Sequence, residues 1–307
     1  MEVRTLAEDP GLNDEVRKFL NLTLWRDFID RRFYRKLTLE DPNYDPKYAL
    51  VALERGNVIA VAIGVRRIRE PAAVVEAQRE VAWVKALAAK PEDVGRLKEL
   101  ITTLEEEFKR EGRRHVRISD YASWYLTPGV DLEYDHIHAM LLDLGYKKVS
   151  EAVNYEVDLS RLYVPSRVAS LAEKLRRDGV EIVELREESE ELGRWVEERF
   201  SPFWRIEAEM GLKAEDGGVL VAKMGSRIAG FSVYGALRPD FFGPIGVDPE
   251  LRGRGIGTVL LFETLKRMRG EGVRIATIPW TTHLFFYTQL PGVVGIRHFI
   301  TLAKTIE

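Results

Sequence analysis

The sequence predicts an α+β protein built from two copies of one unit, and three features of its 307 residues support this class. Residues 49–67 and 218–237 each read as an apolar run, a short polar turn with glycine and a second apolar run, which is typical of a β-hairpin. Residues 83–118 and 243–276 each read as a strand, a turn with proline and an acid, a long amphipathic helix, a glycine and another strand. The length suits two domains of roughly 150 residues each.

The composition is that of a globular protein without a disulfide framework. Hydrophobic residues make up 45% and charged residues 31% of the chain, and 46 Lys and Arg against 49 Asp and Glu give a net charge of −3. We therefore expect no nucleic-acid partner, which would favour a basic excess. The absence of cysteine excludes disulfides, thiol nucleophiles and thiolate metal sites. Many Glu, Lys and Arg residues without cysteine also suit a heat-adapted organism.

The chain has no sequence signal for a membrane. A membrane-spanning helix needs roughly 20 consecutive apolar residues, and no run of the sequence approaches that length. The N-terminal stretch is acidic and lacks the apolar centre of a signal peptide. We therefore expect a cytoplasmic protein with no membrane partner. The sequence does not predict its oligomeric state.

The long helix predicted in each copy sets the limits of the domains. Its apolar residues recur near the 3.6-residue period of an α-helix, and Gly112 and Gly272 follow where helices commonly end. These apolar positions are Leu97, Leu100, Ile101, Leu104 and Phe108 in the first copy and Ile256, Val259, Leu260, Leu265 and Met268 in the second. We expect an N-terminal domain at 1–160, a linker helix at 161–178 and a C-terminal domain at 179–307.

The copies differ at the turn before this helix. The second copy has a turn that alternates arginine or apolar residues with glycine, whereas Asp93–Leu97 in the first has one glycine and an acid. Glycines let the backbone approach an anion, the first N–H groups of a helix have no internal partner, and arginine binds phosphate with two prongs. This turn predicts a pyrophosphate site, the alternative being a basic surface turn. Its residues are Arg252, Gly253, Arg254, Gly255, Ile256, Gly257 and Thr258.

This segment resembles a known family. The run from Val247 to Gly257, with Arg252, Gly255 and Gly257 at the signature positions, is similar to the acetyl-CoA signature of the GCN5-related N-acetyltransferase (GNAT) superfamily. The pair Phe286 and Tyr287 after the next strand is a second feature of that family. The resemblance covers about residues 180–307, and the first half shares only the pattern. The chain therefore resembles a tandem-domain GNAT protein with a degenerate N-terminal copy.

The resemblance implies a fold and a mechanism. Each domain would be a mixed, mostly antiparallel twisted sheet flanked by helices, with acetyl-CoA as cosubstrate between splayed fourth and fifth strands. Its pantetheine arm would pair with Ile245, Gly246 and Val247, and an N–H near Ile245 could hold the oxyanion. The pyrophosphate would rest on Arg252–Thr258. Tyr287 would be the general acid, since a Tyr hydroxyl with an ordinary pKa of about 10 keeps its proton at neutral pH.

The general base and the acceptor stay open. Residues 241–247 carry no acid where many relatives have a glutamate, which leaves Asp240, Glu207, Glu209 and His283 as candidates. Pro244 lacks an N–H, so we expect a bulge there. Aromatic and polar residues could face the acceptor or serve as packing, namely Phe203, Trp204, Trp280, Thr281, Thr282 and His283.

The sequence leaves three hypotheses for the function open. The first is an acetyl-CoA-dependent acetyltransferase that acts on a primary amine, and the second is an acetyl-CoA-binding sensor or regulatory module without turnover. A different acyl group, or an oxygen acceptor, is a third. We expect no metal, because His136 and His138 form the only close histidine pair and no nearby acids are known to converge on them.

Overall fold

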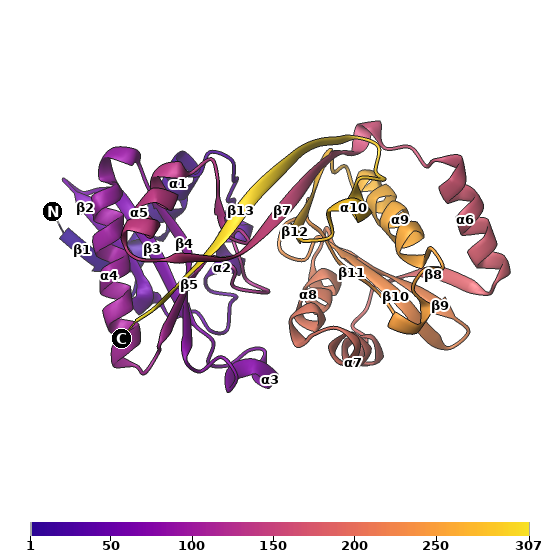
Figure 1. The fold of residues 1–307 in the computed structure, drawn as a ribbon, viewed down its shortest axis with the longest axis horizontal. Coiled ribbons are helices and arrows are strands. Elements are labelled where there is room, and N and C mark those ends of the chain that lie inside the picture. Colours follow the sequence, from indigo (N-terminus) through magenta and orange to yellow (C-terminus); the bar gives the residue numbers. More distant parts are fainter. Residues whose placement is uncertain (1, 307) are drawn as a thin grey trace. The chain divides into compact units, whose positions relative to one another are not determined.

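The computed structural model describes residues 2–306. The chain forms two compact units. The first unit contains the chain up to Ala152 and again from His298, and the second is Val153–Arg297. Strands β7 (Lys147–Asp158) and β13 (Val293–Thr305) each start in one unit and end in the other. Figure 1 shows the elements in sequence colours.

The first unit is an α+β layer structure. Its strands lie in the order β1 (Glu2–Thr5), β2 (Ala49–Glu54), β3 (Asn57–Arg66), β4 (Val81–Ala89), β5 (His115–Ile118) and the end of β13, with β6 (Val130–Asp131) also paired to β13. These neighbours are antiparallel except β4 and β5. The helices are α1 (Asn13–Thr23), α2 (Arg31–Leu37), α3 (Ala72–Val75), α4 (Val94–Arg110) and α5 (Asp135–Asp143).

Helix α4 shows why this unit folds as the sequence predicts. All of its predicted apolar residues are buried. It lies so close to β3 that a Cβ atom on Gly64 would come within 2.7 Å of the Phe108 ring. The close approach requires glycine at this point of the strand.

The second unit contains a four-stranded antiparallel sheet in the order β11 (Phe242–Val247), β10 (Arg227–Tyr234), β9 (Gly218–Met224) and β8 (Val180–Leu185). Strand β12 (Ile275–Thr281) pairs instead with the end of β7. The helices are α6 (Ser166–Arg177), α7 (Glu190–Arg199), α8 (Pro202–Lys213), α9 (Ile256–Gly270) and α10 (Leu284–Tyr287). Short 3-10 turns also occur, namely Pro10–Leu12, Pro46–Tyr48, Pro91–Asp93, Leu159–Arg161 and Pro249–Leu251.

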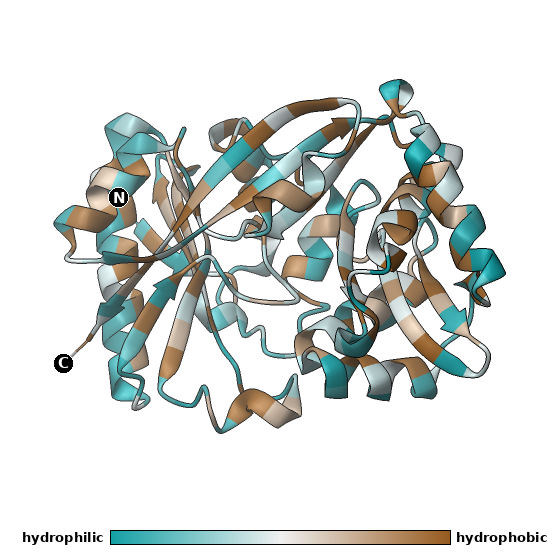
Figure 2. Ribbon diagram, turned by 45° about the vertical axis from the view of Figure 1, so that its right-hand side comes forward, coloured by the Kyte–Doolittle hydropathy of each residue, from teal (hydrophilic) through white to brown (hydrophobic). Residues whose placement is uncertain are grey.

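Successive residues of β9 contribute to apolar clusters on opposite faces of this sheet. Leu220 and Ala222 belong to the apolar cluster that contains the buried side of α9. Val219 and Val221 belong to a second cluster with α7 and α8. Successive strand residues point to opposite faces, so helices cover both sides of the sheet. The resulting mixture of apolar and polar residues along each element is visible in Figure 2.

The structure agrees with the predicted elements and departs from the expected domain limits. Both hairpins are present, closed by the pairs Glu54–Asn57 and Met224–Arg227. Residues 153–160 lie with the second unit and residues 298–306 with the first, because strand pairing there is made with residues distant in sequence. The expected linker helix is α6, and it belongs to the second unit. Among residues 2–306, every helix is too short or too polar to cross a bilayer.

Candidate active site

Strands β11 and β12 diverge in the second unit. They meet at one parallel bridge between Phe241 and Thr277, where the Thr277 N–H donates to the Asp240 carbonyl at 2.8 Å. Beyond this point β11 pairs with β10 and β12 pairs with β7. The splayed strands implied by the resemblance are therefore present, and the second half of β11 has an open edge.

Backbone N–H groups point outward along the open edge of β11. The register of β10 and β11 shifts between Ser232 and Tyr234, opposite Pro244, where we expected a bulge. The Asp248 N–H donates to the Ala229 carbonyl of β10 at 3.0 Å. N–H groups alternate in direction along a strand. Those of Ile245 and Val247 therefore point away from β10.

The glycine-rich turn leads directly into α9. Gly253 and Gly255 have φ of +78° and +87°, a region that glycine adopts without strain. Gly255 is the N-cap residue, and no side chain caps the helix. The first N–H groups of α9 are therefore available to a ligand. A Cβ atom on Gly257 would lie 3.3 Å from Val247 Cγ2, which shows how closely this helix end approaches β11.

An ion pair fixes the turn between β11 and the loop. The side chain of Asp248 is fully buried, and its Oδ2 accepts a hydrogen bond from Arg227 at 2.9 Å. Its Oδ1 accepts the Glu250 N–H at 3.0 Å. Burial opposes ionisation of Asp248, but the hydrogen bonds from Arg227 and the Glu250 N–H outweigh it, so the pKa of this carboxyl lies below its usual value.

One pocket of about 850 Å³ gathers the predicted residues. Its walls come from the end of β11, the glycine-rich turn, the start of α9, the region of α10 and the start of α8. All of the predicted cofactor residues line it except Arg254, which is exposed on the same turn. The lining residues from this set are Ile245, Gly246, Val247, Arg252, Gly253, Gly255, Ile256, Gly257 and Thr258, together with Tyr287.

Tyr287 is buried in the wall of this pocket. It is 7% exposed, and its ring centroid lies 5.0 Å from that of Phe286 and 5.6 Å from that of Tyr155. Burial raises the pKa of Tyr287 above its usual value and outweighs the neighbouring Thr281 side chain, which lowers it. The phenol therefore carries its proton at neutral pH, as a general acid must.

The candidate bases differ in their surroundings. Asp240 accepts hydrogen bonds from Arg238 at 2.8 and 2.9 Å and from Thr277 at 3.2 Å. Glu209 accepts from Arg205 at 2.8 Å. His283 is exposed and lines the pocket, whereas Glu207 lies on α8 outside the pocket lining.

One aromatic residue of the pocket, Phe200, was not predicted from the sequence. Phe200 and Trp204 both line it, and their rings stack with centroids 5.2 Å apart. A Cβ atom on Gly246 would come within 2.5 Å of the Phe200 ring, so this ring lies directly on β11. Phe203, which the sequence suggested with Trp204, does not line the pocket. Phe200 follows the end of α7 and Trp204 belongs to α8, so no helical spacing in the sequence indicated this pair.

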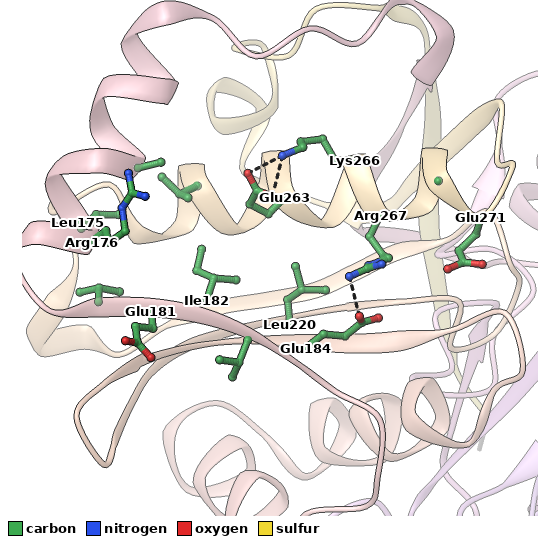
Figure 3. A pocket seen from close by; sticks show the side chains of 15 residues that line it. Leu175, Arg176, Glu181, Ile182, Glu184, Leu220, Glu263, Lys266, Arg267 and Glu271 are labelled. Carbon is green, nitrogen blue, oxygen red and sulfur yellow. Dashed lines mark hydrogen bonds and ion pairs between the residues drawn. The ribbon is translucent and has the colours of Figure 1, made fainter.

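A second pocket of about 960 Å³ lies along the other part of α9, between α6, α9 and β8. It contains none of the predicted site residues. Figure 3 shows Arg267 of α9 paired with Glu184 of β8, with N and O atoms 2.7 Å apart, and Lys266 paired with Glu263. The first of these pairs ties α9 to the edge of the sheet.

The corresponding turn of the first unit is built differently. Helix α4 starts at Val94 directly after a 3-10 turn, and Gly95 is an ordinary residue of its first turn. A cavity of only about 20 Å³ lies beside β4 and is lined by side chains such as Leu126 and Ile137. In the described part of the chain, no cluster of His, Asp and Glu could hold a metal ion.

Comparisons with known proteins agree with this architecture. Residues 176–284 match the family model described as Acetyltransferase (GNAT) family. No curated protein sequence matches the chain significantly. Residues 176–284 of the second unit therefore form a GNAT domain.

Solved structures extend the likeness to the whole chain. A GCN5-related glucosamine N-acetyltransferase region of a fungal multi-domain GH3 β-N-acetylglucosaminidase is similar with a TM-score of 0.77 and 16% identity, over 99% of this chain and 38% of that one. The chain thus spans well under half of that protein. A tandem GNAT protein from the clavulanic acid biosynthesis pathway has a TM-score of 0.68 and 15% identity, over 100% and 98% of the two chains.

A GCN5-related N-acetyltransferase from Sphaerobacter thermophilus has a TM-score of 0.65 and 15% identity, over 100% of this chain and 96% of that one. At these identities the likeness concerns the fold. The chain has the fold of a tandem GNAT protein, and the predicted fold class is confirmed.

Proposed function

We propose that this protein is an acetyl-CoA-dependent N-acetyltransferase that acts on a primary amine by direct attack. One observation carries the proposal. A single pocket combines the open edge of β11, the uncapped start of α9 with its glycine-rich turn, and the buried phenol Tyr287. The first two features suit an amide-containing arm that ends in a pyrophosphate, and the third suits a leaving group that needs a proton.

The cosubstrate supplies the acetyl group as an activated thioester. The outward N–H groups at Ile245 and Val247 would bind the amide arm as an added strand does. The first N–H groups of α9 and Arg252 would hold the pyrophosphate. The Ile245 N–H could also donate to the oxygen on which negative charge develops.

Proton transfer completes the reaction. A bond forms between the amine nitrogen and the acetyl carbon, and the bond from that carbon to sulfur breaks. Tyr287 gives its proton to the departing sulfur, and the proton lost by the nitrogen passes through water to restore the phenol. His283, at the pocket wall, is the candidate best placed to take this proton from the nitrogen and pass it to that water, because arginines already engage Asp240 and Glu209.

We further propose that the first unit is a degenerate copy without a cofactor of its own. The turn before α4 has no left-handed glycine, and the cavity beside β4 measures only about 20 Å³. Calorimetry should therefore give one equivalent of bound acetyl-CoA per chain. A Gly257→Asp variant should lose this binding, since the carboxylate would repel the pyrophosphate while an acid in the first turn remains favourable to the helix.

Turnover is tested with a panel of amines by following thiol release. Amino sugars come first, because one structural neighbour is a glucosamine N-acetyltransferase region. Tyr287→Phe should retain binding and lose most turnover. Absence of acetyl-CoA binding by the natural protein would overturn the proposal.

A binding module that senses acetyl-CoA without turnover is the second candidate. It is favoured by the absence of an acid on β11 and by the arginines that engage Asp240 and Glu209. Tight binding without acetylation of any amine in the panel would support this alternative.

A further inference from the structure

Two aromatic side chains form one side of the candidate pocket. Phe200 follows α7 directly, with its N–H donating to the Val196 carbonyl at 3.0 Å, and Trp204 lies in the first turn of α8. The Trp204 N–H donates to Ser201 Oγ at 3.2 Å, so a capped helix start holds this residue in place. Both side chains are half-buried and line the pocket. The short junction between α7 and α8 therefore brings two neighbouring rings to the same wall.

These two rings are supported by further aromatic residues. The planes of Phe200 and Trp204 enclose an angle of 27°. The ring centroid of the fully buried Phe231 lies 5.6 Å from that of Phe200 and 6.1 Å from that of Trp204, and Trp195 lies 5.6 Å from Phe200. On β11, only the absence of a side chain at Gly246 leaves room for the Phe200 ring. Rings that are held in this way lose little freedom when a ligand rests on them.

The aromatic wall and the glycine-rich turn lie on opposite faces of the sheet. Phe200 and Trp204 pack with the apolar cluster of α7 and α8. Ile245 and Val247 pack with the cluster that contains α9. Because all of these residues line one pocket, the pocket passes around the open edge of β11. A cosubstrate bound to that edge and to the start of α9 leaves the aromatic side to the acceptor.

The pocket has few polar side chains. In the part of the chain that the structure describes, no Asp or Glu lines it. Glu197 of α7 and Glu209 of α8 each accept a hydrogen bond from Arg205 at 2.8 Å. An acceptor with several hydroxyl groups or a second ammonium group would therefore leave polar groups without partners, which is costly. The charged, imidazole and hydroxyl side chains of the lining are Arg252, Thr258, Thr282, His283 and Tyr287.

The lack of an acid also affects the amine that reacts. Removal of water disfavours an ammonium ion that has no carboxylate partner, so binding in this pocket favours the neutral amine. The neutral amine is the form that attacks a thioester. A single amine on an apolar body therefore suits the pocket, whose aromatic wall and few polar groups are typical of small-molecule sites.

We propose, on the basis of the proposed function, that the acceptor is a monoamine that carries a flat aromatic group, and that this group rests on Trp204. The reaction is the one given above, in which the amine nitrogen gains the acetyl group and the thioester sulfur gains a proton, so no further reactant is needed. Contacts between aromatic rings add attraction beyond the apolar area that they bury. The pocket should therefore distinguish an aromatic ring from a saturated ring of equal size.

The test compares the acetylation of 2-phenylethylamine, 2-cyclohexylethylamine, glucosamine and spermidine. The value of kcat/KM for 2-phenylethylamine should exceed that for 2-cyclohexylethylamine about 2- to 10-fold, because only the former has an aromatic ring. It should exceed the values for glucosamine and spermidine at least about 10-fold, because the additional hydroxyl and ammonium groups lack partners in the pocket.

Substitutions of the aromatic wall test the role of Trp204. Trp204→Leu should remove or reverse the preference for the phenyl over the cyclohexyl ring, and Trp204→Phe should retain it. Trp195→Leu is the matched control, because the Trp195 ring contacts Phe200 and Phe231 but does not line the pocket. This control should lose stability and keep the preference. A preference that survives in Trp204→Leu, or that is lost equally in Trp195→Leu, would overturn the proposal.

The outcomes separate this inference from the proposed function. A protein that binds acetyl-CoA and acetylates glucosamine or spermidine better than 2-phenylethylamine would refute the aromatic acceptor alone, whereas a protein that does not bind acetyl-CoA would refute the function as well. If none of these amines is acetylated, calorimetry in the presence of coenzyme A measures the binding of 2-phenylethylamine itself. The natural protein should bind it at least about fivefold more tightly than Trp204→Leu does. Equal binding by the two proteins, or no binding, would refute the inference.

Discussion

Replacing Gly257 by alanine should separate the stability of α9 from its capacity to bind a ligand. Gly257 is the second residue of α9 and lines the candidate pocket. Its Cβ atom would lie 3.3 Å from Val247 Cγ2 and 3.7 Å from the Phe286 ring. The added methyl group therefore enters the narrow space between the helix end and β11, and the neighbours need to move only a few tenths of an ångström.

The substitution should affect the stability of the unliganded protein and its affinity for acetyl-CoA in opposite directions. Alanine within a helix is more favourable than glycine by roughly 0.5–1 kcal/mol, so the unliganded protein should be about as stable as before or slightly more stable. A ligand displaced by the methyl group loses at least one hydrogen bond between a charged phosphate and an N–H. Such a bond contributes about 1.5–3 kcal/mol. The dissociation constant for acetyl-CoA should accordingly rise about 10- to 150-fold.

The control is Gly270→Ala in the last turn of the same helix. A Cβ atom at Gly270 meets nothing within 4 Å, and Gly270 does not line the candidate pocket. Calorimetry gives the affinity of each variant, and thermal unfolding without ligand gives its stability. Equal affinity in Gly257→Ala and the natural protein, or an equal loss in both variants, would refute the reasoning that the start of α9 meets the ligand.

Three further predictions concern other contacts. Arg227→Met should lower the free energy of unfolding by about 1–3 kcal/mol at neutral pH, because it leaves the Asp248 carboxylate buried without its cation. The pKa of Asp248 is lowered in the folded protein, so the stabilisation that the pair provides is lost as the pH falls. In thermal unfolding, the difference between the variant and the natural protein should therefore shrink below about pH 4, where the carboxyl of the unfolded chain is protonated. Burial, against the pull of Arg117, raises the pKa of Asp120 to about 6, so its protonated form favours the folded state and stability is lost as pH rises from about 4 to 6. In urea unfolding, the free energy of unfolding of Asp120→Asn relative to that of the natural protein should therefore increase by about 2–3 kcal/mol between pH 4 and 7. A difference between the two proteins that does not change with pH would contradict this assignment. Tyr155→Phe removes the hydrogen bond from the Tyr155 hydroxyl to the Leu284 carbonyl at the start of α10, and should lower kcat about 2- to 10-fold at unchanged acetyl-CoA affinity. A weakened affinity with normal kcat would argue against a role of Tyr155 in holding α10.

Local chemistry explains what the sequence could predict. The hairpins, the buried faces of α4 and α9 and the glycine-rich turn all depend on residues close together in the chain. The period of Leu97–Phe108, for example, is enough to define the buried side of α4. The grouping of Ile245–Val247, the turn and Tyr287 in one pocket was expected from the resemblance, and the structure brings these residues together. Their chemical roles remain predictions.

Long-range contacts explain what the sequence could not predict. Nothing near Tyr155 indicates that its hydroxyl donates to the Leu284 carbonyl, because the two residues are 129 positions apart in the chain. The stacking of Phe200 on β11 depends on the approach of α7 and α8 to the sheet. The pairing of β13 with β5 joins residues such as Leu302 and Ile118, and no local pattern specifies such a pair.

The discontinuous first unit has a consequence for the order in which the protein is made. Its sheet includes the segment from His298 onward, which the ribosome synthesises after all of Val153–Arg297. The GNAT domain can therefore close while the first unit still exposes the edge of β5, which β13 later covers. A released chain that ends at Arg297 should be cut by protease in the first unit before the second, and the reverse order would contradict this sequence of events. In the living cell, the part of the chain that is translated first is the last to be finished.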